Sequence, residues 1–439
     1  MFSPLVRILL YLLLVVGPLV LVTVRGGTSE GFVYELGRNA AIAAFMILFA
    51  QVLLAARIKW IERPFGLDIL LRYHKYMGLA ALVMLLCHPL LLAAGSGRLA
   101  LLISLDQPWF IWTGKIALLL LLIHIGVSLY VYRLKLQFET WRRIHDILAP
   151  LLLLLAFLHS IYAGADLQQP GGRVLWIGLL LVFMGVYGWH RFFRPLRLKN
   201  SPWEVTDVQA ESDNVWSVKL APPAGAGVFD YLPGQFQFIT FYRGRGLPAE
   251  EHHWTISSSP AEKGFVSSTI KALGDFTATI KETRPGDKAA VHGPFGRFSH
   301  TLHPEERDLV FVAGGIGITP LMSMLRYMRD AADDRSVLLL YGNPKMEAAV
   351  FREELAEIEA SGRPRLKVVH VLSSPNEGWS GETGFVDGEK IRRYCGDDLS
   401  GKTFYVCGPP PLIAGVVAAL GEMGVAHQRI RVEIFSFLD

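Results

Sequence analysis

Six long apolar stretches occupy the first half of the chain and restrict its fold more than any other feature. Each is close to the ~20 residues that a helix needs to cross the hydrocarbon core of a bilayer. Hydrophobic residues make up 51% of the chain, and the surplus lies in this half. We therefore expect an integral membrane protein with an all-α, six-helix transmembrane bundle. The expected spans are residues 5–24, 38–56, 68–94, 110–132, 144–163 and 173–192.

The charges between these stretches predict their orientation. Basic residues gather after the second, fourth and sixth stretches, whereas the other three connections are close to charge-balanced. The positive-inside rule then places the N- and C-termini in the cytoplasm, and we expect the membrane to be a bacterial inner (plasma) membrane. The first stretch is expected to be an uncleaved membrane helix, because it lacks the small-residue cleavage pattern of a signal peptide. A formal net charge of +4 gives no indication of nucleic-acid binding.

Four histidines lie in the third and fifth stretches, separated by 14 positions in each: His74 and His88, then His145 and His159. Fourteen helical steps rise ~21 Å and return a side chain to within ~40° of its first direction. Two such helices side by side would present two facing imidazole pairs at two depths, which is the ligand set of two six-coordinate haems b. The predicted orientation makes His74 and His145 the inner pair. The alternative, buried structural histidines, is less favoured because imidazole is unfavourable in lipid.

The composition changes after residue 199, and the second half divides into two patterns. Short alternating strands separated by Pro and Gly predict an antiparallel β-barrel over 200–303. Alternating strands and helices predict an α/β, Rossmann-like nucleotide-binding domain over 304–439. With the membrane domain at 1–199, we expect three domains. The expected strands are 216–220, 235–239, 266–270 and 288–291 in the barrel, and 309–313, 336–341, 366–371 and 403–406 in the nucleotide-binding domain.

A glycine-rich sequence, Val-Ala-Gly-Gly-Ile-Gly-Ile-Thr-Pro at 312–320, follows an expected strand and opens a helix. Glycines let a backbone approach a pyrophosphate, whose charge is favoured at a helix N-terminus. This turn alone is a weak signal, but a second strand-end turn, Cys-Gly-Pro-Pro at 407–410, supports a nicotinamide site. The candidate residues are Gly314, Gly315, Gly317, Thr319, Pro320, Cys407, Gly408 and Pro409.

A second motif, His-His-Trp-Thr-Ile-Ser-Ser at 252–258, ends an expected barrel strand, and Lys-Ala-Leu-Gly-Asp-Phe-Thr follows at 271–277. An aromatic plane, clustered hydroxyls, one cation and a glycine turn suit the flat ring and pyrophosphate of a flavin dinucleotide. The Ser/Thr run taken alone is equally compatible with an ordinary polar strand end. Its position before a nicotinamide domain favours FAD.

These motifs carry a family resemblance. Residues 201–439 resemble the ferredoxin-NADP reductase type of flavin dehydrogenase, and the whole chain resembles the ferric reductase and NADPH oxidase flavocytochrome b family. The family's H-P-F-T-x-S-S motif matches 252–258, with His253 where proline is usual. The resemblance implies that Trp254 packs on the flavin and that Thr255 faces its ring. The flavin-binding residues it implies are His252, Trp254, Thr255, Ser257, Ser258, Lys271, Gly274, Asp275, Phe276 and Thr277.

The resemblance also assigns residues outside these motifs. It places two haem b groups on His74, His88, His145 and His159, and an arginine near the outer haem at Arg38, for which an interfacial arginine is an equal alternative. The place of a further histidine in some oxidases is Leu92 here, which weakens the expectation of oxygen as acceptor. Cys407 and two aromatic residues are candidates for the reacting site. Phe435, and in second place Phe437, would cover the isoalloxazine ring. The alternative is that these aromatic side chains only pack in the barrel.

The nucleotide preference is expected to depend on Lys345 and Arg352, which could meet a 2′-phosphate and slightly favour NADPH over NADH. The expected function is electron transfer from cytoplasmic NAD(P)H through FAD and two haems to an acceptor on the outer face. Oxygen, giving superoxide, ranks first and a ferric chelate is a near-level alternative. A third reading is a membrane subunit that donates electrons to a periplasmic partner protein, although no obligate protein partner is expected. His124 is expected to be a packed residue, with a ligand or proton-relay role as the alternative.

Overall fold

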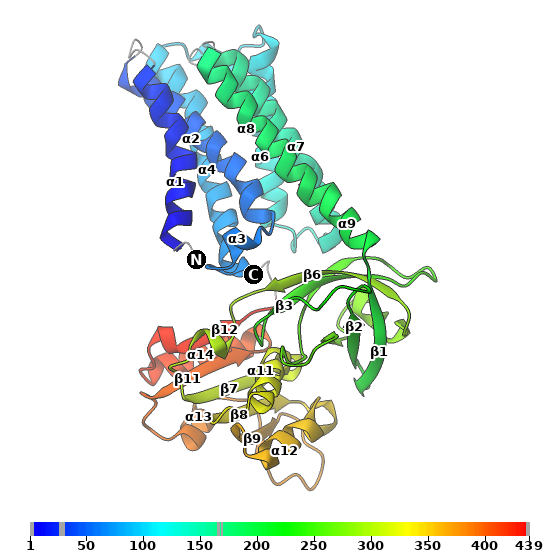
Figure 1. The fold of residues 1–439 in the computed structure, drawn as a ribbon. Helices are drawn as coiled ribbons and strands as arrows, with labels where there is room; N and C mark the ends of the chain where they lie inside the picture. The colour runs from blue at the N-terminus through cyan, green and yellow to red at the C-terminus, as the bar shows by residue number, and fades with distance from the viewer. Residues whose placement is uncertain (1–3, 26–30, 165–166, 168–169, 436–439) are drawn as a thin grey trace. The chain divides into compact units, whose positions relative to one another are not determined.

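The structure, a computed structural model, describes residues 4–25, 31–164, 167 and 170–435 (Figure 1). Two compact units divide the chain between Arg194 and Pro195. The first unit is helical, and the second contains two six-stranded sheets. The expected end of the membrane domain, residue 199, lies near the end of the helix that begins at Arg194.

Among the described residues of the first unit, six helices are long and apolar enough to cross a membrane, which confirms the six expected spans. The helix at the sixth span continues through a π-helical turn, Trp189–Phe193, into α9, Arg194–Asn200. Two short helices, α3 (Lys59–Glu62) and α5 (Ala100–Ile103), lie in the connections. The long helices are α1 (Pro4–Arg25), α2 (Phe32–Ala55), α4 (Leu67–Ser96), α6 (Trp109–Leu129), α7 (Phe138–Ala163) and α8 (Pro170–Gly188).

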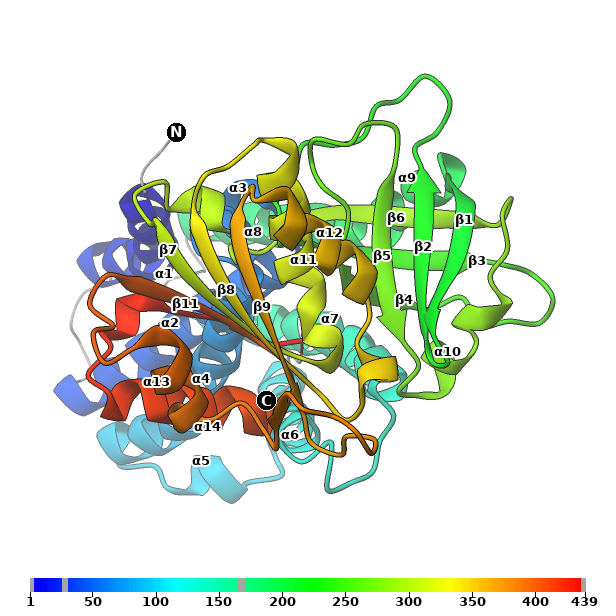
Figure 2. The same cartoon turned by 90° about the horizontal axis from the view of Figure 1, so that it is seen from below.

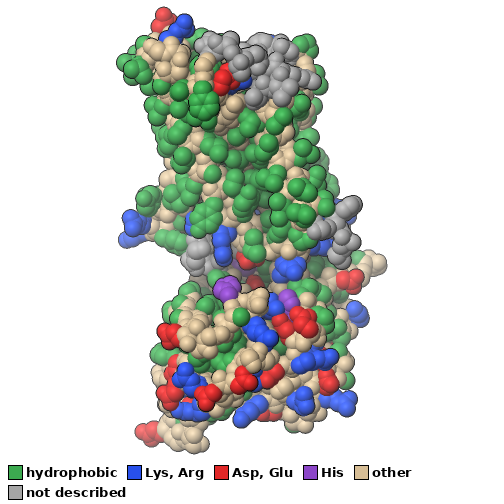
Figure 3. Space-filling view, turned by 90° about the vertical axis from the view of Figure 1, so that its left-hand side faces the viewer, with side chains coloured by type: hydrophobic (Ala, Val, Ile, Leu, Met, Phe, Trp, Pro, Cys, Tyr) green, Lys and Arg blue, Asp and Glu red, His purple; other side chains and the backbone are tan. Residues whose placement is uncertain are grey.

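The outer surface of the helical unit is apolar. On the face shown in Figure 3, hydrophobic side chains cover the helices, whereas Lys, Arg, Asp and Glu gather on the second unit. Large aliphatic side chains such as Leu13, Val174 and Leu181 are exposed by 65%, 71% and 66%. A continuous apolar surface of this kind is unfavourable in water, and helices satisfy their own backbone groups, so the unit is suited to lipid.

Small residues allow the helices to approach closely. A Cβ atom added to Gly95 on α4 would lie 2.5 Å from the backbone nitrogen of Tyr34 on α2. Close backbone approach at small residues is a common device of membrane helices, which gain no hydrophobic stabilisation from leaving lipid. The α2–α4 and α6–α7 pairs are therefore set by packing at glycine as well as by larger side chains.

The first sheet of the second unit is antiparallel, with strand order β4-β3-β6-β1-β2-β5. Just after the edge strand β4, the Ser257 N–H donates at 2.8 Å to the carbonyl of Ser267 in β5, the other edge strand, which brings the sheet edges together as in the expected barrel. The short helix α10 (Asp275–Ala278) follows β5. The strands are β1 (Trp203–Ser212), β2 (Val215–Ala221), β3 (Phe236–Tyr242), β4 (Glu251–Thr255), β5 (Val266–Lys271) and β6 (Lys288–Phe295).

The second sheet is parallel, with strand order β10-β9-β8-β7-β11-β12, which confirms the expected α/β fold (Figure 2). The strands are β7 (Asp308–Gly314), β8 (Ser336–Asn343), β9 (Arg365–Leu372), β10 (Glu382–Thr383), β11 (Lys402–Cys407) and β12 (Ile430–Glu433). Its helices are α11 (Ile318–Asp330), α12 (Arg352–Ser361), α13 (Gly388–Cys395) and α14 (Pro410–Glu422).

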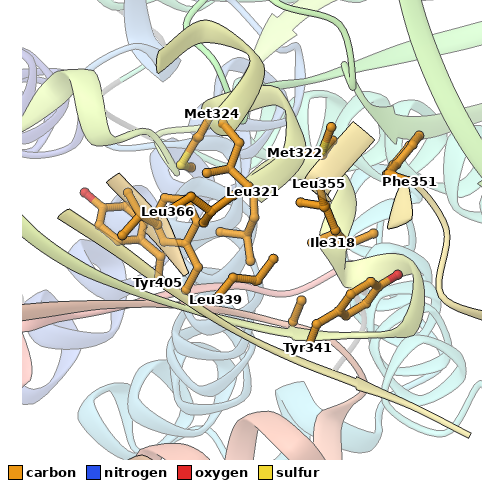
Figure 4. Close-up of a cluster of buried hydrophobic side chains, with 14 of the residues drawn as sticks. Ile318, Leu321, Met322, Met324, Leu339, Tyr341, Phe351, Leu355, Leu366 and Tyr405 are labelled. Atoms are coloured by element: carbon orange, nitrogen blue, oxygen red, sulfur yellow. The ribbon is translucent and has the colours of Figure 1, made fainter. Parts of the chain in front are cut away.

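A core beneath α11 fixes the start of this helix (Figure 4). Ile318, Leu321 and Met324 of α11 are fully buried against Leu339 of β8 and Tyr405 of β11. Burying a large aliphatic side chain contributes about 1.5–3 kcal/mol. The turn between β7 and α11, which carries the glycine-rich motif, is therefore held by packing on both sides.

Candidate functional site

The four histidines form two facing pairs between α4 and α7. The ring centres of His74 and His145 are 6.1 Å apart, and those of His88 and His159 are 6.4 Å apart. A metal bound between two imidazoles, at about 2 Å from each nitrogen, places the ring centres about 6 Å apart. Both pairs thus fit the axial ligation of a haem iron.

The second pair is oriented by backbone carbonyls of two other helices. Nδ1 of His88 lies 3.0 Å from the carbonyl oxygen of Gly37 on α2, and Nδ1 of His159 lies 2.8 Å from that of Phe110 on α6. Because a carbonyl only accepts, each Nδ1 carries the proton and donates. That tautomer leaves the Nε2 lone pair for a metal, which is the usual arrangement of ligating histidines.

Two glycines make room for this arrangement. A Cβ atom at Gly114 on α6 would lie 2.6 Å from Nδ1 of His159, and one at Gly37 would lie 2.8 Å from Cβ of Leu91 on α4. Sequence reasoning missed both glycines and the Phe110 carbonyl. A glycine within an apolar span was the available signal, but it does not reveal which helix it faces.

Two aromatic rings pack on His145, one member of the first pair. The rings of His124 on α6 and Trp141 on α7 pack on His145, with Trp141 at 5.5 Å centre to centre. Trp141 Nε1 donates to Ser128 Oγ at 3.2 Å, and that hydroxyl donates to the His124 carbonyl at 2.8 Å. His124 is packed, as expected, and a ligand role for it stays open.

Arg38 lies on α2, beside Gly37, and forms an ion pair with Glu35 at 2.5 Å. The pair is only partly exposed, with 20% of the Arg38 side chain and 14% of the Glu35 side chain accessible. The expected role of Arg38 beside a haem stays a prediction.

The aromatic part of the flavin motif lies on β4 and α10. The His252 ring stacks on Phe276 at 4.2 Å, and Trp254 stacks on Phe276 at 6.0 Å. Trp254 also contacts Phe241 of β3 at 5.8 Å. The partly exposed His252 and Trp254 thus lie on the buried rings of Phe276 and Phe241, next to the buried Thr255. The expected packing of Trp254 on a flavin stays a prediction.

Ser257 and Ser258 are fully buried, and their hydroxyls are engaged within the protein. Ser257 Oγ lies 3.1 Å from Ser267 Oγ and 3.0 Å from Thr269 Oγ1. Ser258 Oγ lies 3.0 Å from the Tyr231 hydroxyl. These hydroxyls stabilise the end of the motif, and a direct role in flavin binding stays a prediction.

The predicted pyrophosphate turn follows β5. Thr277 Oγ1 accepts from the backbone N–H groups of Leu273 and Gly274, both at 2.9 Å, and Asp275 Oδ1 accepts from the Phe276 N–H at 2.8 Å. Gly274 and Asp275 are exposed and Lys271 is partly exposed, so the turn is accessible and shaped by its own side chains.

The two nicotinamide motifs meet at the carboxyl ends of neighbouring parallel strands. Ala313 of β7 pairs with Cys407 of β11. A Cβ atom at Gly317 would lie 2.3 Å from the Cys407 carbonyl oxygen, and one at Gly314 would lie 2.8 Å from Cδ of Pro409. Only glycine permits this approach. The structure therefore brings together the two turns that the sequence separates by about ninety positions.

The remaining nucleotide candidates differ in exposure. Thr319 and Pro320 are buried, and Thr319 Oγ1 donates to the Ile316 carbonyl at 3.0 Å. Lys345 and Arg352, after β8, are exposed and accessible to an anionic group. The Cys407 thiol is fully buried, and burial raises its pKa well above the ordinary value, so it is neutral.

A set of hydrogen bonds joins the two cofactor motifs. Ser323 Oγ on α11 donates to the Ser258 carbonyl at 2.8 Å, and Arg326 Nη1 donates to the Ser257 carbonyl at 2.6 Å. Arg326 also holds Glu354 of α12 through two bonds, at 2.9 and 2.6 Å. Burial alone would raise the pKa of Glu354, but the bonds from Arg326 and Arg329 lower it below the ordinary value. The helix that begins at the nicotinamide turn is thus tied to the flavin motif.

The aromatic candidate Phe435 follows β12, and its carbonyl accepts a hydrogen bond from Nε2 of His253 at 2.8 Å. The second candidate, Phe437, lies outside the described residues. Whether Phe435 covers a flavin ring stays a prediction.

Three protein-family models match successive parts of the chain. Residues 40–156 match the ferric reductase like transmembrane component, residues 202–300 the oxidoreductase FAD-binding domain, and residues 311–418 the oxidoreductase NAD-binding domain. The chain is therefore a membrane-bound flavoprotein oxidoreductase that uses NAD(P)H. In the order of these parts it is similar to ferric reductase and NADPH oxidase-like proteins, with a dehydrogenase module like that of the ferredoxin-NADP reductase type.

Similar curated proteins match the second half. One subunit of the Na⁺-translocating NADH-quinone reductase of Pseudomonas aeruginosa is 29% identical over 197 residues, which are 42% of this chain and 48% of that protein. NADH-cytochrome b5 reductase 1 of Neosartorya fischeri is 29% identical over 235 residues, 52% of this chain and 74% of that protein. The chain thus spans about half the length of the first of these relatives. Among solved structures, the cytochrome b5 reductase domain of Ulva prolifera nitrate reductase has 21% identity and a TM-score of 0.47, covering 53% of this chain and 96% of that chain.

Proposed function

We propose that this protein transfers electrons across a membrane, from cytoplasmic NAD(P)H through FAD and two haems b to an acceptor on the outer face. The observation that carries the proposal is that four histidines on α4 and α7 face each other two by two. The ring centres are 6.1 Å apart in His74 and His145 and 6.4 Å apart in His88 and His159. Their position within candidate membrane spans supports a route through the bilayer. The basic segments after the second, fourth and sixth spans support a cytoplasmic position for the flavin module.

The residues present fit the groups that the proposal requires. His74 with His145, and His88 with His159, would each hold one haem, and the 252–258 motif with the turn at 271–277 would hold FAD. When bound, FAD exchanges electron pairs with a nicotinamide and single electrons with a haem. The chain supplies ligands, orientation and burial. Electron transfer needs no acid–base catalyst. The buried Cys407 thiol, which stays neutral, is consistent with a site that has none.

The chain's own residues hold the site in one geometry. The carbonyls of Gly37 and Phe110 fix the tautomer and orientation of His88 and His159. Ser323 and Arg326 fix the flavin motif to α11. Main-chain and helix positions therefore set the distances on which electron transfer depends.

The acceptor is proposed from the one-electron chemistry of haem. A haem b passes single electrons, so the acceptor takes one: oxygen, giving superoxide, is the first candidate and a ferric chelate the second. A periplasmic redox protein would be the third. The built-in dehydrogenase module supports the first two, because a pure relay protein would take electrons from a separate donor.

The acceptor can be identified with the purified full-length protein in detergent, supplied with NADPH or NADH. Superoxide production is measured as dismutase-sensitive cytochrome c reduction, and ferric reduction is measured without oxygen. An oxidase gives a large dismutase-sensitive rate in air, whereas a ferric reductase gives a faster chelate rate in the absence of oxygen. If neither oxygen nor the ferric chelate re-oxidises the reduced haems, a partner protein is favoured as the acceptor. A protein purified with FAD but without haem would refute the transmembrane route.

A further inference from the structure

A buried arginine is bonded to the segment that follows the predicted pyrophosphate turn at 271–277. Arg243 comes directly after β3, and only 3% of it is exposed. Its Nη1 donates to the Thr279 carbonyl at 2.9 Å, and its Nη2 donates to Thr279 Oγ1 at 2.9 Å. Nη2 also donates to the Pro248 carbonyl at 3.2 Å, and Nη1 to Thr283 Oγ1 at 3.4 Å. Because Thr279 is the residue after α10, these bonds fix the end of the short helix into which the turn leads.

The same guanidinium contacts the aromatic ring inside the turn. Its central carbon lies 5.1 Å from the centre of the Phe276 ring, which is itself buried. A cation over an aromatic face is attracted to it, and the attraction is larger where water is excluded. Phe276 also carries the stacked ring of His252, at 4.2 Å. Arg243 therefore holds α10 at Phe276 and Thr279, and with α10 it holds the exposed turn at Gly274.

The charge of Arg243 is buried without a neutralising partner. Among the described residues no carboxylate forms an ion pair with it, and its Nε has no hydrogen-bond partner. Asp287, the acidic residue that acts on it most strongly, is held by Arg245 through two bonds, at 3.1 and 2.8 Å. Buried charges are usually paired, because removing them from water is costly. An anion that binds at the adjacent turn is therefore stabilised by a positive charge that no acid of the barrel cancels.

We propose that Arg243 is a positioning residue for FAD, which fixes the turn at 271–277 and supplies from inside the barrel the positive charge that favours the pyrophosphate. The proposal rests on the FAD-binding part of the proposed function. Arg243 lies outside both flavin motifs and, being buried, acts through Phe276 and Thr279 and through its field. It therefore selects a flavin that carries phosphate groups over riboflavin, which has the same ring and none.

The test measures the affinity of two flavins for the full-length protein after its FAD has been removed. FAD and riboflavin are titrated separately, and binding is followed by the quenching of flavin fluorescence. Arg243→Met removes the charge and the donors but keeps much of the apolar length. We expect its affinity for FAD to fall about tenfold to a hundredfold, and its affinity for riboflavin to stay within about threefold. Arg243→Lys keeps the charge, so its affinity for FAD recovers to within about tenfold of that of the unchanged protein.

Lys281→Met is the matched control, because it removes the same charge from an exposed side chain two residues beyond Thr279. Its affinity for FAD should stay within about twofold of the unchanged value. If Arg243→Met does not fold, Arg243→Gln takes its place with the same expectation, since it loses the charge but keeps a donor for Thr279.

Two results would overturn the proposal. One is an unchanged affinity for FAD in the uncharged variant. The other is an equal loss of affinity for FAD and riboflavin, which would show that Arg243 only packs the barrel. An unchanged protein that binds neither flavin would instead refute the FAD-binding part of the proposed function.

Discussion

The imidazole ring of His124 on α6 lies 4.5 Å, centre to centre, from that of His145 on α7, inclined by 46°. His145 in turn faces His74 at 6.1 Å. The ring of His145 thus has a candidate ligand partner, His74, on one side and a packed histidine, His124, nearby. The distance from His124 is too short for a metal between the two rings, which would need about 6 Å between centres.

We therefore predict that His124→Phe retains both haems. The change preserves an aromatic neighbour for His145 but alters its polarity, so the midpoint potential of one haem shifts while the other stays constant. Haem content by pyridine haemochrome and a spectroelectrochemical titration measure the two effects. Loss of one haem equivalent would instead make His124 a ligand.

Replacement of the second histidine pair should remove one haem and leave flavin chemistry intact. In His88→Ala or His159→Ala, one axial ligand is lost from the pair whose ring centres are 6.4 Å apart. We expect half of the haem content with FAD fully retained, and anaerobic flavin reduction by NADPH at the unchanged rate. Full haem content in either variant would contradict the assignment of this pair.

Gly114 offers a test of the space around His159. In Gly114→Ala the new methyl group would lie 2.6 Å from Nδ1 of His159, so the ring must move and its bond to the Phe110 carbonyl is strained. We expect reduced occupancy of one haem and a loss of stability of about 1–3 kcal/mol. Gly126→Ala on the same helix is the control, because nothing lies within 4 Å of its new Cβ. Equal haem content and melting temperature in the two variants would show that the space is not limiting.

His300 should make stability depend on pH. It is fully buried, and neither ring nitrogen has a hydrogen-bond partner among the described residues. Burial and the nearby Arg335 lower its pKa to about 3, although Asp333 acts in the opposite direction. The unfolded chain then binds a proton that the folded chain excludes, so stability falls as the pH drops from about 6.5 toward 3.

The loss contributed by His300 between about pH 6.5 and about pH 5 is at most ~2 kcal/mol. Urea unfolding of the full-length protein, followed by flavin fluorescence at several pH values, measures it. In His300→Met the dependence should be flatter over this range by the same amount. An unchanged slope would show that other groups are responsible.

The sequence was sufficient for features that depend on local pattern. Apolar length predicted the six spans, and the 14-residue spacing predicted that His74 and His88 share a face toward His145 and His159. Strand-end motifs predicted that the turns at Gly317 and Cys407 both serve a nicotinamide site, and the structure brings them together because the carboxyl ends of parallel strands share one edge of a sheet.

Contacts between distant backbones were beyond the same reasoning. The partners of His88 and His159 are carbonyls, which every residue has, so no residue type in the sequence marks Gly37 or Phe110 as special. The Arg326 contact to the Ser257 carbonyl was hidden for the same reason. His253 was noticed as a departure from a motif, but its bond to Phe435 depends on the packing of two sheets.

The use of main-chain oxygens at Gly37 and Phe110 has a consequence for how this site can change over evolutionary time. A carbonyl has two lone pairs, so it can serve a helix and a histidine together, and no side-chain replacement deletes it. Selection on the orientation of His88 and His159 therefore acts on the spacing of four helices rather than on the identity of one acceptor. Point substitutions perturb this arrangement by moving a helix or by displacing a ring, as at Gly114, which makes it tolerant of most drift in sequence and sensitive to added side-chain volume at the helix contacts.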